Sequence, residues 1–330
     1  MSFKIPPVYI PMLGLYFILL ILRFTLTGFE QFITLIWFYI TLGQAFNIFL
    51  GMTGYVDFGY SAFLALGMYG MAISVISLSK SALAGTLILA IGVILGIVLV
   101  SLLALTIGGI ALRLRGAYFA IATIGVNEGL RFLIEGAGIW GGSEGLIMAK
   151  PLRDIFGESL VTVVQIEFAD YALFTISLAT AFITHYIITS RMGYALKAIK
   201  EDEDAAKVLG VNTTKYKILA FLISAIIAGL IGSMLSLKIV AIFPPQAFLV
   251  TYVVEAITIV VIGGAGTLLG PIFGGLIYAS LKYLLMTTFP GLQLLILAPL
   301  LLSIILFFPE GAVSWLKYKA RGTRFEGYLL

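Results

Sequence analysis

Charged and amide side chains inside apolar stretches are the residues of this sequence whose types could do chemistry. Such a group is costly in hydrocarbon, so it normally faces the interior of a helix bundle or a polar route through it. Glu128 and Arg131 are three residues apart, so a helix places them on one face, where they can pair. A structural ion pair and the lining of a polar route are both open for them. The candidates for a polar route are Asp57, Asn127, Glu128, Arg131 and Glu255.

Two charged residues at the ends of apolar stretches, Glu255 and Lys282, have a simpler interpretation as interfacial residues. Glu255 opens a short apolar segment, so an interfacial position is an alternative to a place on the route. Lys282 lies near the end of its stretch, and we expect its long side chain to extend outward to the interface.

Residue types that bind metals or act as nucleophiles are scarce. The chain has no cysteine, which excludes disulfides and thiolate sites, and its single histidine, His185, cannot form a zinc site alone. The sequence contains neither a Gly-x-Ser-x-Gly motif nor a Gly-x-x-x-x-Gly-Lys-[Ser/Thr] phosphate-binding loop. We therefore expect no catalytic residue, no metal and no cofactor bound by this chain, and we do not expect an enzyme.

The composition indicates a lipid environment. Of 330 residues, 61% are hydrophobic and 11% are charged, against about 25% charged in a soluble protein. The stretch 83–112 carries no charge and is long enough to cross a hydrocarbon core about 30 Å thick. Long unbroken stretches favour helices over the alternating strands of a barrel. The net charge of +4 needs no nucleic-acid partner, because the membrane topology accounts for it.

The predicted fold is an all-α polytopic membrane protein with about ten (8–10) transmembrane helices, some broken or half-length. The chain 1–330 is treated as one transmembrane domain, and its start as a retained first span rather than a cleaved signal peptide. Most of the 20 Lys and Arg fall on one side, so by the positive-inside rule both termini, the stretch 190–214 and the tail 309–330 are expected in the cytoplasm, and 136–168 outside. The expected spans are roughly 8–27, 31–50, 56–78, 82–112, 116–135, 169–189, 215–241, 250–263, 268–287 and 292–308.

The stretch from Tyr194 to Leu209 is the most informative hydrophilic segment. It holds strong helix formers and no Pro or Gly, so we expect one amphipathic helix with its acidic residues in the middle. Gly210 suits the helix end, and Asn212 or Thr213 suits the start of the next helix. Such a helix could dock a soluble partner, and a plain solvated connection is the alternative.

The order Asp204-Ala-Ala-Lys-Val-Leu-Gly210 resembles the EAA motif of ABC-importer permeases, with aspartate in place of the usual glutamate. The blocks 51–63, 114–125, 141–145 and 261–271 resemble, in order, the branched-chain amino-acid ABC permease family, LivM-like branch. Asp57 stands where many relatives have an uncharged polar residue. The glycine clusters at 51–59 and 263–275 suit close helix packing, and broken helices that bind a zwitterion are the alternative.

The resemblance implies an importer permease of the cell membrane that carries leucine, isoleucine, valine or related solutes. It implies two cytoplasmic ATPases that use ATP and Mg²⁺, an external substrate-binding protein, and a second permease, either homologous (LivH-like) or another copy of this chain. The segment that couples to the ATPases would comprise Glu201, Asp202, Glu203, Asp204, Ala205, Ala206 and Gly210. The rival hypothesis is a proton- or ion-coupled secondary transporter that uses Glu128 or Glu255.

Overall fold

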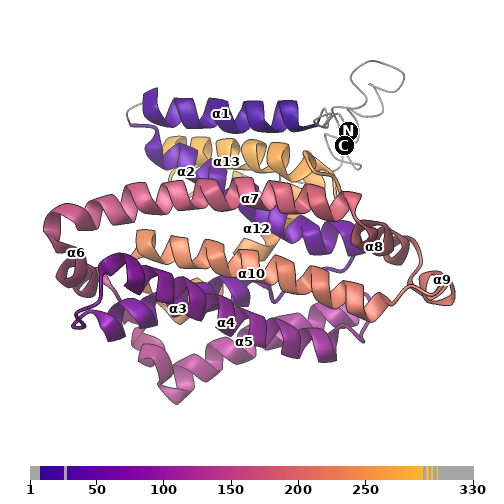
Figure 1. Ribbon diagram of the computed structural model, residues 1–330, viewed down its shortest axis with the longest axis horizontal. Helices are drawn as coiled ribbons and strands as arrows, with labels where there is room; N and C mark the ends of the chain where they lie inside the picture. Colours follow the sequence, from indigo (N-terminus) through magenta and orange to yellow (C-terminus); the bar gives the residue numbers. More distant parts are fainter. Residues whose placement is uncertain (1–7, 26–27, 293–294, 297–298, 300–302, 304–330) are drawn as a thin grey trace, which may run out of the picture.

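The computed structural model describes residues 8–25, 28–292, 295–296, 299 and 303. These residues form a bundle of long, roughly aligned helices with two short strands (Figure 1). The elements in chain order are α1 Tyr9–Thr25, α2 Glu30–Phe46, the π-helix η1 Asn47–Gly51, α3 Tyr60–Leu78, α4 Gly85–Ala111, α5 Ala117–Ala137, the 3₁₀-helix η2 Ile139–Glu144, β1 Leu146–Ile147, α6 Ala149–Val163, the π-helix η3 Val164–Phe168, α7 Ala169–Thr189, α8 Arg191–Glu201, α9 Glu203–Val208, α10 Thr213–Ile239, β2 Ala241–Ile242, α11 Pro244–Ala247, α12 Thr251–Gly263 and α13 Gly270–Thr288.

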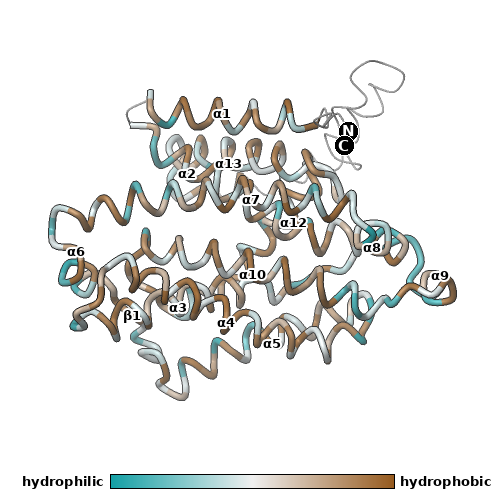
Figure 2. Tube along the Cα trace, viewed as in Figure 1, coloured by the Kyte–Doolittle hydropathy of each residue, from teal (hydrophilic) through white to brown (hydrophobic). Residues whose placement is uncertain are grey.

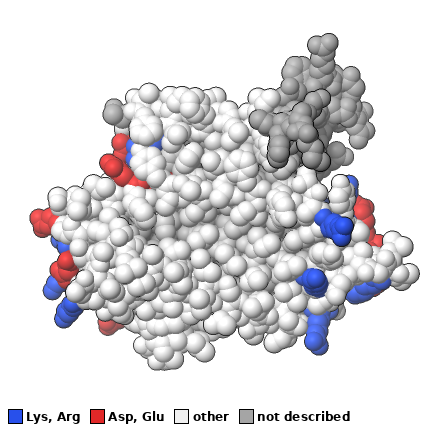
Figure 3. Space-filling model, viewed as in Figure 1, with Lys and Arg blue, Asp and Glu red and all other residues white. Residues whose placement is uncertain are grey.

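The bundle has the polarity of a membrane protein. Within the described residues, seven helical segments are long and apolar enough to cross a membrane. Hydrophobic residues cover the long helices, and hydrophilic residues concentrate toward α8 and α9 at one end and around α6 at the other (Figure 2). On the face shown in Figure 3, charged side chains lie mainly toward the two ends, with an uncharged band between them. The prediction of an all-α polytopic membrane fold is confirmed.

The first nine expected spans each contain an observed helix, and the short eighth one ends at Gly263 as the sequence indicates. The tenth expected span, 292–308, lies mostly outside the described residues, as does the tail 309–330. The stretch 136–168, read from sequence only as a hydrophilic connection, contains α6 and runs through η3 into α7. Its strand β1 pairs antiparallel with β2, the strand that follows α10.

Glycines bring α3, α4 and α10 into close contact at the centre of the bundle. A Cβ atom built on Gly67 of α3 would lie 2.1 Å from the carbonyl oxygen of Gly229 in α10, and one on Gly232 would lie 2.0 Å from that of Leu64. Likewise, a Cβ on Gly70 would lie 2.4 Å from Gly96 in α4. Small residues allow such close approach where lipid gives helices no hydrophobic reason to associate. This glycine seam holds the three helices as one block.

The turn between α12 and α13 is held by amide side chains of α2 and η1. Asn47 donates to the carbonyl of Thr267 (3.0 Å) and accepts from the amide of Gly266 (2.8 Å). Gln44 donates to the carbonyl of Leu268 (3.2 Å). Backbone outside a helix is tolerated at such a place because the protein satisfies its polar groups. The second glycine cluster therefore marks a clamped break between two helices.

Candidate functional site

The hydrophilic segment after α7 is two helices, and the prediction of one helix from Tyr194 to Leu209 is wrong. Asp202 interrupts it with an extended backbone (φ −156°, ψ 110°). Its carboxylate accepts from the amides of Asp204 (2.9 Å) and Ala205 (3.0 Å) and so caps α9. A short acidic side chain competes for nearby amides and favours caps over helix interiors. The acidic residues therefore lie around a break instead of mid-helix.

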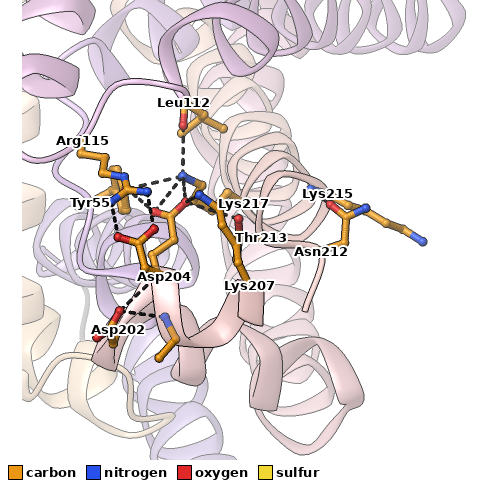
Figure 4. A network of polar contacts seen from close by, with 12 residues as sticks. Tyr55, Leu112, Arg115, Asp202, Asp204, Lys207, Asn212, Thr213, Lys215 and Lys217 are labelled. Atoms are coloured by element: carbon orange, nitrogen blue, oxygen red, sulfur yellow. Dashed lines mark hydrogen bonds and ion pairs between the residues drawn. The ribbon is translucent and has the colours of Figure 1, made fainter. Parts of the chain in front are cut away.

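Glu203 points back into the bundle. Its carboxylate pairs with Lys217 of α10 (2.9 Å) and accepts from the hydroxyl of Tyr55 (2.5 Å). Figure 4 labels Lys217 and Tyr55 in this network. Lys217 also donates to the carbonyl of Leu112 at the end of α4 (3.0 Å). The Glu203 and Lys217 side chains are only 10% and 3% exposed. This short-range network joins α9 to α10, to the end of α4 and to the segment before α3.

The electrostatic state of Glu203 follows from these contacts. Burial acts to raise the pKa of its carboxyl, but hydrogen bonds from Tyr55, Lys217 and Lys207 outweigh burial and lower the pKa to about 2. Glu203 is thus an anion at neutral pH, matched by Lys217 and by Lys207 at 3.1 Å.

A second ion pair joins α9 to the connection between α4 and α5. Arg115 donates two parallel hydrogen bonds to the Asp204 carboxylate, both at 2.7 Å (Figure 4). The hydrogen bonds from Arg115 lower the pKa of Asp204. Both side chains are more than half exposed, so this pair stabilises weakly but has a defined geometry. We call Tyr55, Arg115, Glu203, Asp204 and Lys217 the α9 cluster.

The end of α9 exposes two large apolar side chains. Val208 and Leu209 are 88% and 82% exposed, whereas Ala206 is buried at 2%. Gly210 takes a left-handed backbone (φ +86°), and the amide of Val211 bonds to the carbonyl of Ala206 (3.0 Å), closing the end of the helix. Two large apolar side chains at a solvent-facing tip are typical of an interaction site. The sequence-based coupling candidates include neither residue, although Leu209 was expected on the apolar face of the helix and both stand directly before the motif's glycine.

The coupling candidates therefore divide by direction. Glu203 and Ala206 face the bundle, whereas Glu201, Asp202, Asp204 and Ala205 are exposed. Lys200 of α8 donates to the carbonyl of Gly51 at the end of η1 (2.9 Å), and its burial lowers its pKa. The two short helices thus contact the ends of several long helices.

Three of the candidates for a polar route are buried in structural contacts. Asp57 accepts from the amide of Gly59 (2.8 Å). Asn127 of α5 accepts from Ser61 of α3 (2.9 Å) and donates to the carbonyl of Phe248 (3.0 Å). Their burial, at 1% and 0% exposure, places both in the packing of α3 against α5.

Glu255, the third, forms a separate group toward the other end of the bundle. It pairs with Lys282 (2.6 Å) and accepts from the hydroxyl of Tyr39 (3.1 Å). The expectation that Lys282 extends outward is wrong, because the buried carboxylate on the neighbouring helix draws its ammonium inward. This group ties α2, α12 and α13 together.

Glu128 and Arg131 pair as predicted, at 2.8 Å, on α5. Their side chains are 36% and 24% exposed, so they are the accessible members of the candidate set. The same helix has open surface at Gly125 and Gly129, where an added Cβ would meet no atom within 4 Å. Among the membrane-crossing segments in the described residues, α5 has the smallest fraction of its residues buried inside the protein. In the part of the chain that the structure describes, no group of three His, Cys, Asp or Glu residues is placed to hold a metal ion.

Comparison with known proteins agrees with this architecture. The family model of the branched-chain amino acid transport system, permease component, matches residues 28–308. The chain is 27% identical over 303 residues to the high-affinity branched-chain amino acid transport system permease protein LivM of Salmonella typhimurium. The match covers 84% of this chain and 68% of that protein. It is also 27% identical over 244 residues to the high-affinity branched-chain amino acid transport system permease protein LivH of Escherichia coli. That match covers 72% of this chain and 79% of LivH. No solved structure matches the chain significantly.

A bundle of apolar membrane-crossing helices with these relatives defines a multi-pass transport permease of the cell membrane. Within that class, the chain belongs to the family of permease components of branched-chain amino acid transport systems.

Proposed function

We propose that this chain is the membrane-spanning subunit of an ATP-binding-cassette importer for branched-chain or related amino acids. ATP and Mg²⁺ are used by two separate ATPase subunits, and an external binding protein delivers the solute. The observation that carries the proposal is the construction of α9. It presents Val208 and Leu209 outward while Glu203 and Asp204 fasten it to the bundle.

This arrangement suits the transfer of motion from a soluble partner. The exposed apolar tip would fill a groove of an ATPase, where desolvated hydrophobic anchors provide most of the binding energy. A displacement of α9 would then pass through Arg115 to the start of α5 and through Lys217 to the start of α10. The sequence alone predicts that the acidic residues contact the ATPases. We propose instead that Glu203 and Asp204 hold α9 against the bundle and that Val208 and Leu209 dock into the ATPase.

We further propose that the open face of α5 lies against a second permease, LivH-like or a copy of this chain, with the solute route between them. Glu128 and Arg131 are costly at a lipid-facing surface, so a protein or water-filled neighbour fits them better. Both LivM and LivH relatives are permease proteins of branched-chain amino acid systems, which supports a paired assembly. The buried contacts of Asp57, Asn127 and Glu255 favour structural roles for these three.

The test is uptake of radiolabelled leucine into vesicles that contain this chain, its partner subunits and the binding protein. ATP should drive accumulation, and an uncoupler should leave it intact. Leu209→Asp should abolish uptake and the binding of the ATPases, while Tyr194→Asp, which changes an exposed residue on α8, should retain both. Accumulation without ATPases, abolished by the uncoupler, would establish the secondary transporter instead.

A further inference from the structure

A cavity of about 480 Å³ lies within this single chain, away from α8 and α9. It is lined by residues of α2, the η3–α7 segment, α10, α12 and α13 and is partly open to the outside. Asp170, which lines it, is at the start of α7, whereas α8 follows the other end of that helix. Figure 1 shows α8 and α9 at one end of α7, so the cavity, which is lined by a residue at the start of α7, lies toward the opposite end of the bundle. Its volume is in the range of small-molecule sites.

Two ammonium groups with spare hydrogen-bond donors line this cavity. Lys238 of α10 bonds to Asp170, and Lys282 of α13 bonds to Glu255 and to Tyr39. An ammonium has three N–H donors, so these contacts leave capacity on each lysine. Their side chains are 25% and 20% exposed, enough for a small ligand to reach them. The pair offers a place for an anionic group.

A carboxylate with capacity to spare lines the same cavity. Glu30 at the start of α2 is 44% exposed, and its ion pair with Arg23 is long, at 3.4 Å. Asp170, in contrast, is 1% exposed and held by both Arg23 and Lys238. Glu30 is therefore the acid best able to accept from a ligand's ammonium group.

The charges of the lining balance, and its walls are apolar. Among the described lining residues two are acidic, Glu30 and Asp170, and two are basic, Lys238 and Lys282. A ligand with net charge would upset this balance, whereas a zwitterion would keep it. Between the charged groups, the lining includes the apolar side chains of Leu35, Phe38, Leu173 and Leu235.

We propose that this cavity binds a free α-amino acid with an apolar side chain. The carboxylate lies at Lys238 and Lys282, the ammonium at Glu30, and the side chain on the wall formed by Phe38 and Leu173. The site is inside one chain, so it is separate from a route between two permeases. That its ligand is of the class the importer carries rests on the proposed function.

The test is equilibrium binding of radiolabelled leucine to the purified full-length chain in nanodiscs, with no partner subunits. Wild type should bind saturably. Lys238→Met, which removes a donor, and Leu35→Trp, which fills the cavity and keeps every charge, should each weaken binding at least tenfold. Lys150→Met, which removes an exposed charge on α6, should bind as wild type does.

Two competitors and one further measurement decide the ligand class. Isocaproate lacks the ammonium and isoamylamine lacks the carboxylate, so neither should displace leucine at concentrations where isoleucine does. Displacement by isocaproate equal to that by isoleucine would overturn the zwitterion assignment. Absence of saturable binding, equal binding by Leu35→Trp, or a phospholipid retained in native mass spectra that leucine never displaces would overturn the site. Because this assay needs no ATP, these failures are distinguishable from a failure of ATP-driven uptake.

Discussion

The buried pair of Glu203 and Lys217 gives a quantitative test of how α9 is held. Glu203→Ala leaves the Lys217 ammonium, 3% exposed, with the Leu112 carbonyl and the Tyr55 hydroxyl but without this buried counter-charge. Removing one partner of a buried pair costs about 3–5 kcal/mol. Since these two acceptors remain, we expect the lower end, about 3 kcal/mol. Each 1.4 kcal/mol is about tenfold, so the docked population of α9 should fall about 100-fold relative to the undocked one.

Hydrogen–deuterium exchange of the backbone amides in residues 203–211 measures this change, because local opening exposes them. In nanodiscs, Glu203→Ala should exchange there about 100-fold faster than wild type, with the amides of α3 and α10 unchanged. The double variant Glu203→Leu with Lys217→Met removes both charges together. Replacing a buried pair by apolar residues of similar size is often nearly neutral, so its exchange should return to within about tenfold of wild type.

The matched control is Glu201→Ala, which removes an exposed acid just before the break. Such a surface change should shift the opening free energy by less than about 0.5 kcal/mol. Equal exchange in Glu203→Ala and Glu201→Ala would refute the conclusion that the pair holds α9. A double variant as open as the single one would show that the ionic interaction itself is required.

Three further predictions concern the same region. Arg115→Asp and Asp204→Arg should each reduce leucine-stimulated ATP hydrolysis by the reconstituted assembly, and combining them should restore it, because the bidentate pair re-forms in reverse; a double variant no better than either single one would contradict this. Gly210→Val should lower the thermal unfolding temperature of the purified chain more than Gly210→Asn does, since a left-handed backbone costs a non-glycine residue about 1–2 kcal/mol and asparagine tolerates it best; equal shifts would argue against backbone strain. Because the pKa of Glu203 is lowered from 4.5 to about 2, its stabilising contribution is full above about pH 4.5 and is lost as the pH falls toward 2. The difference in unfolding temperature between wild type and Glu203→Gln should therefore be constant from about pH 8 to 5 and shrink below 4.5, and an unchanged difference at about pH 3 would count against the shift.

The helical spans could be predicted because lipid imposes a strong local rule. A stretch such as 83–112 must satisfy its backbone internally, so hydrophobicity and length alone indicate a helix. The Glu128–Arg131 pair could also be predicted, because its geometry depends on spacing within one helix. Gly210 and Asn212 ended and began helices as expected, since caps are local too.

Features set by distant residues could not be predicted. The direction of Glu203 depends on Tyr55, 148 residues away in the sequence. Lys282 turns inward because Glu255 is buried on the neighbouring helix. The break at Asp202 is a local feature that the prediction also missed, because a propensity count over the segment favours a continuous helix over a capping carboxylate. The balanced cavity joins five parts of the chain, and periodicity carries no information about such a site.

The glycine seam has a consequence for biogenesis. Gly67 of α3 finds its closest neighbour in Gly229 of α10, and α4 to α9 all lie between them in the sequence. During synthesis, α3 enters the bilayer before α10 is made. Until then, the surface of α3 around Gly67 has no α10 to pack against. A nascent chain that stalls before Thr213 would leave that surface open to lipid or to the insertion machinery. Quality control of this protein should therefore act on the late arrival of α10.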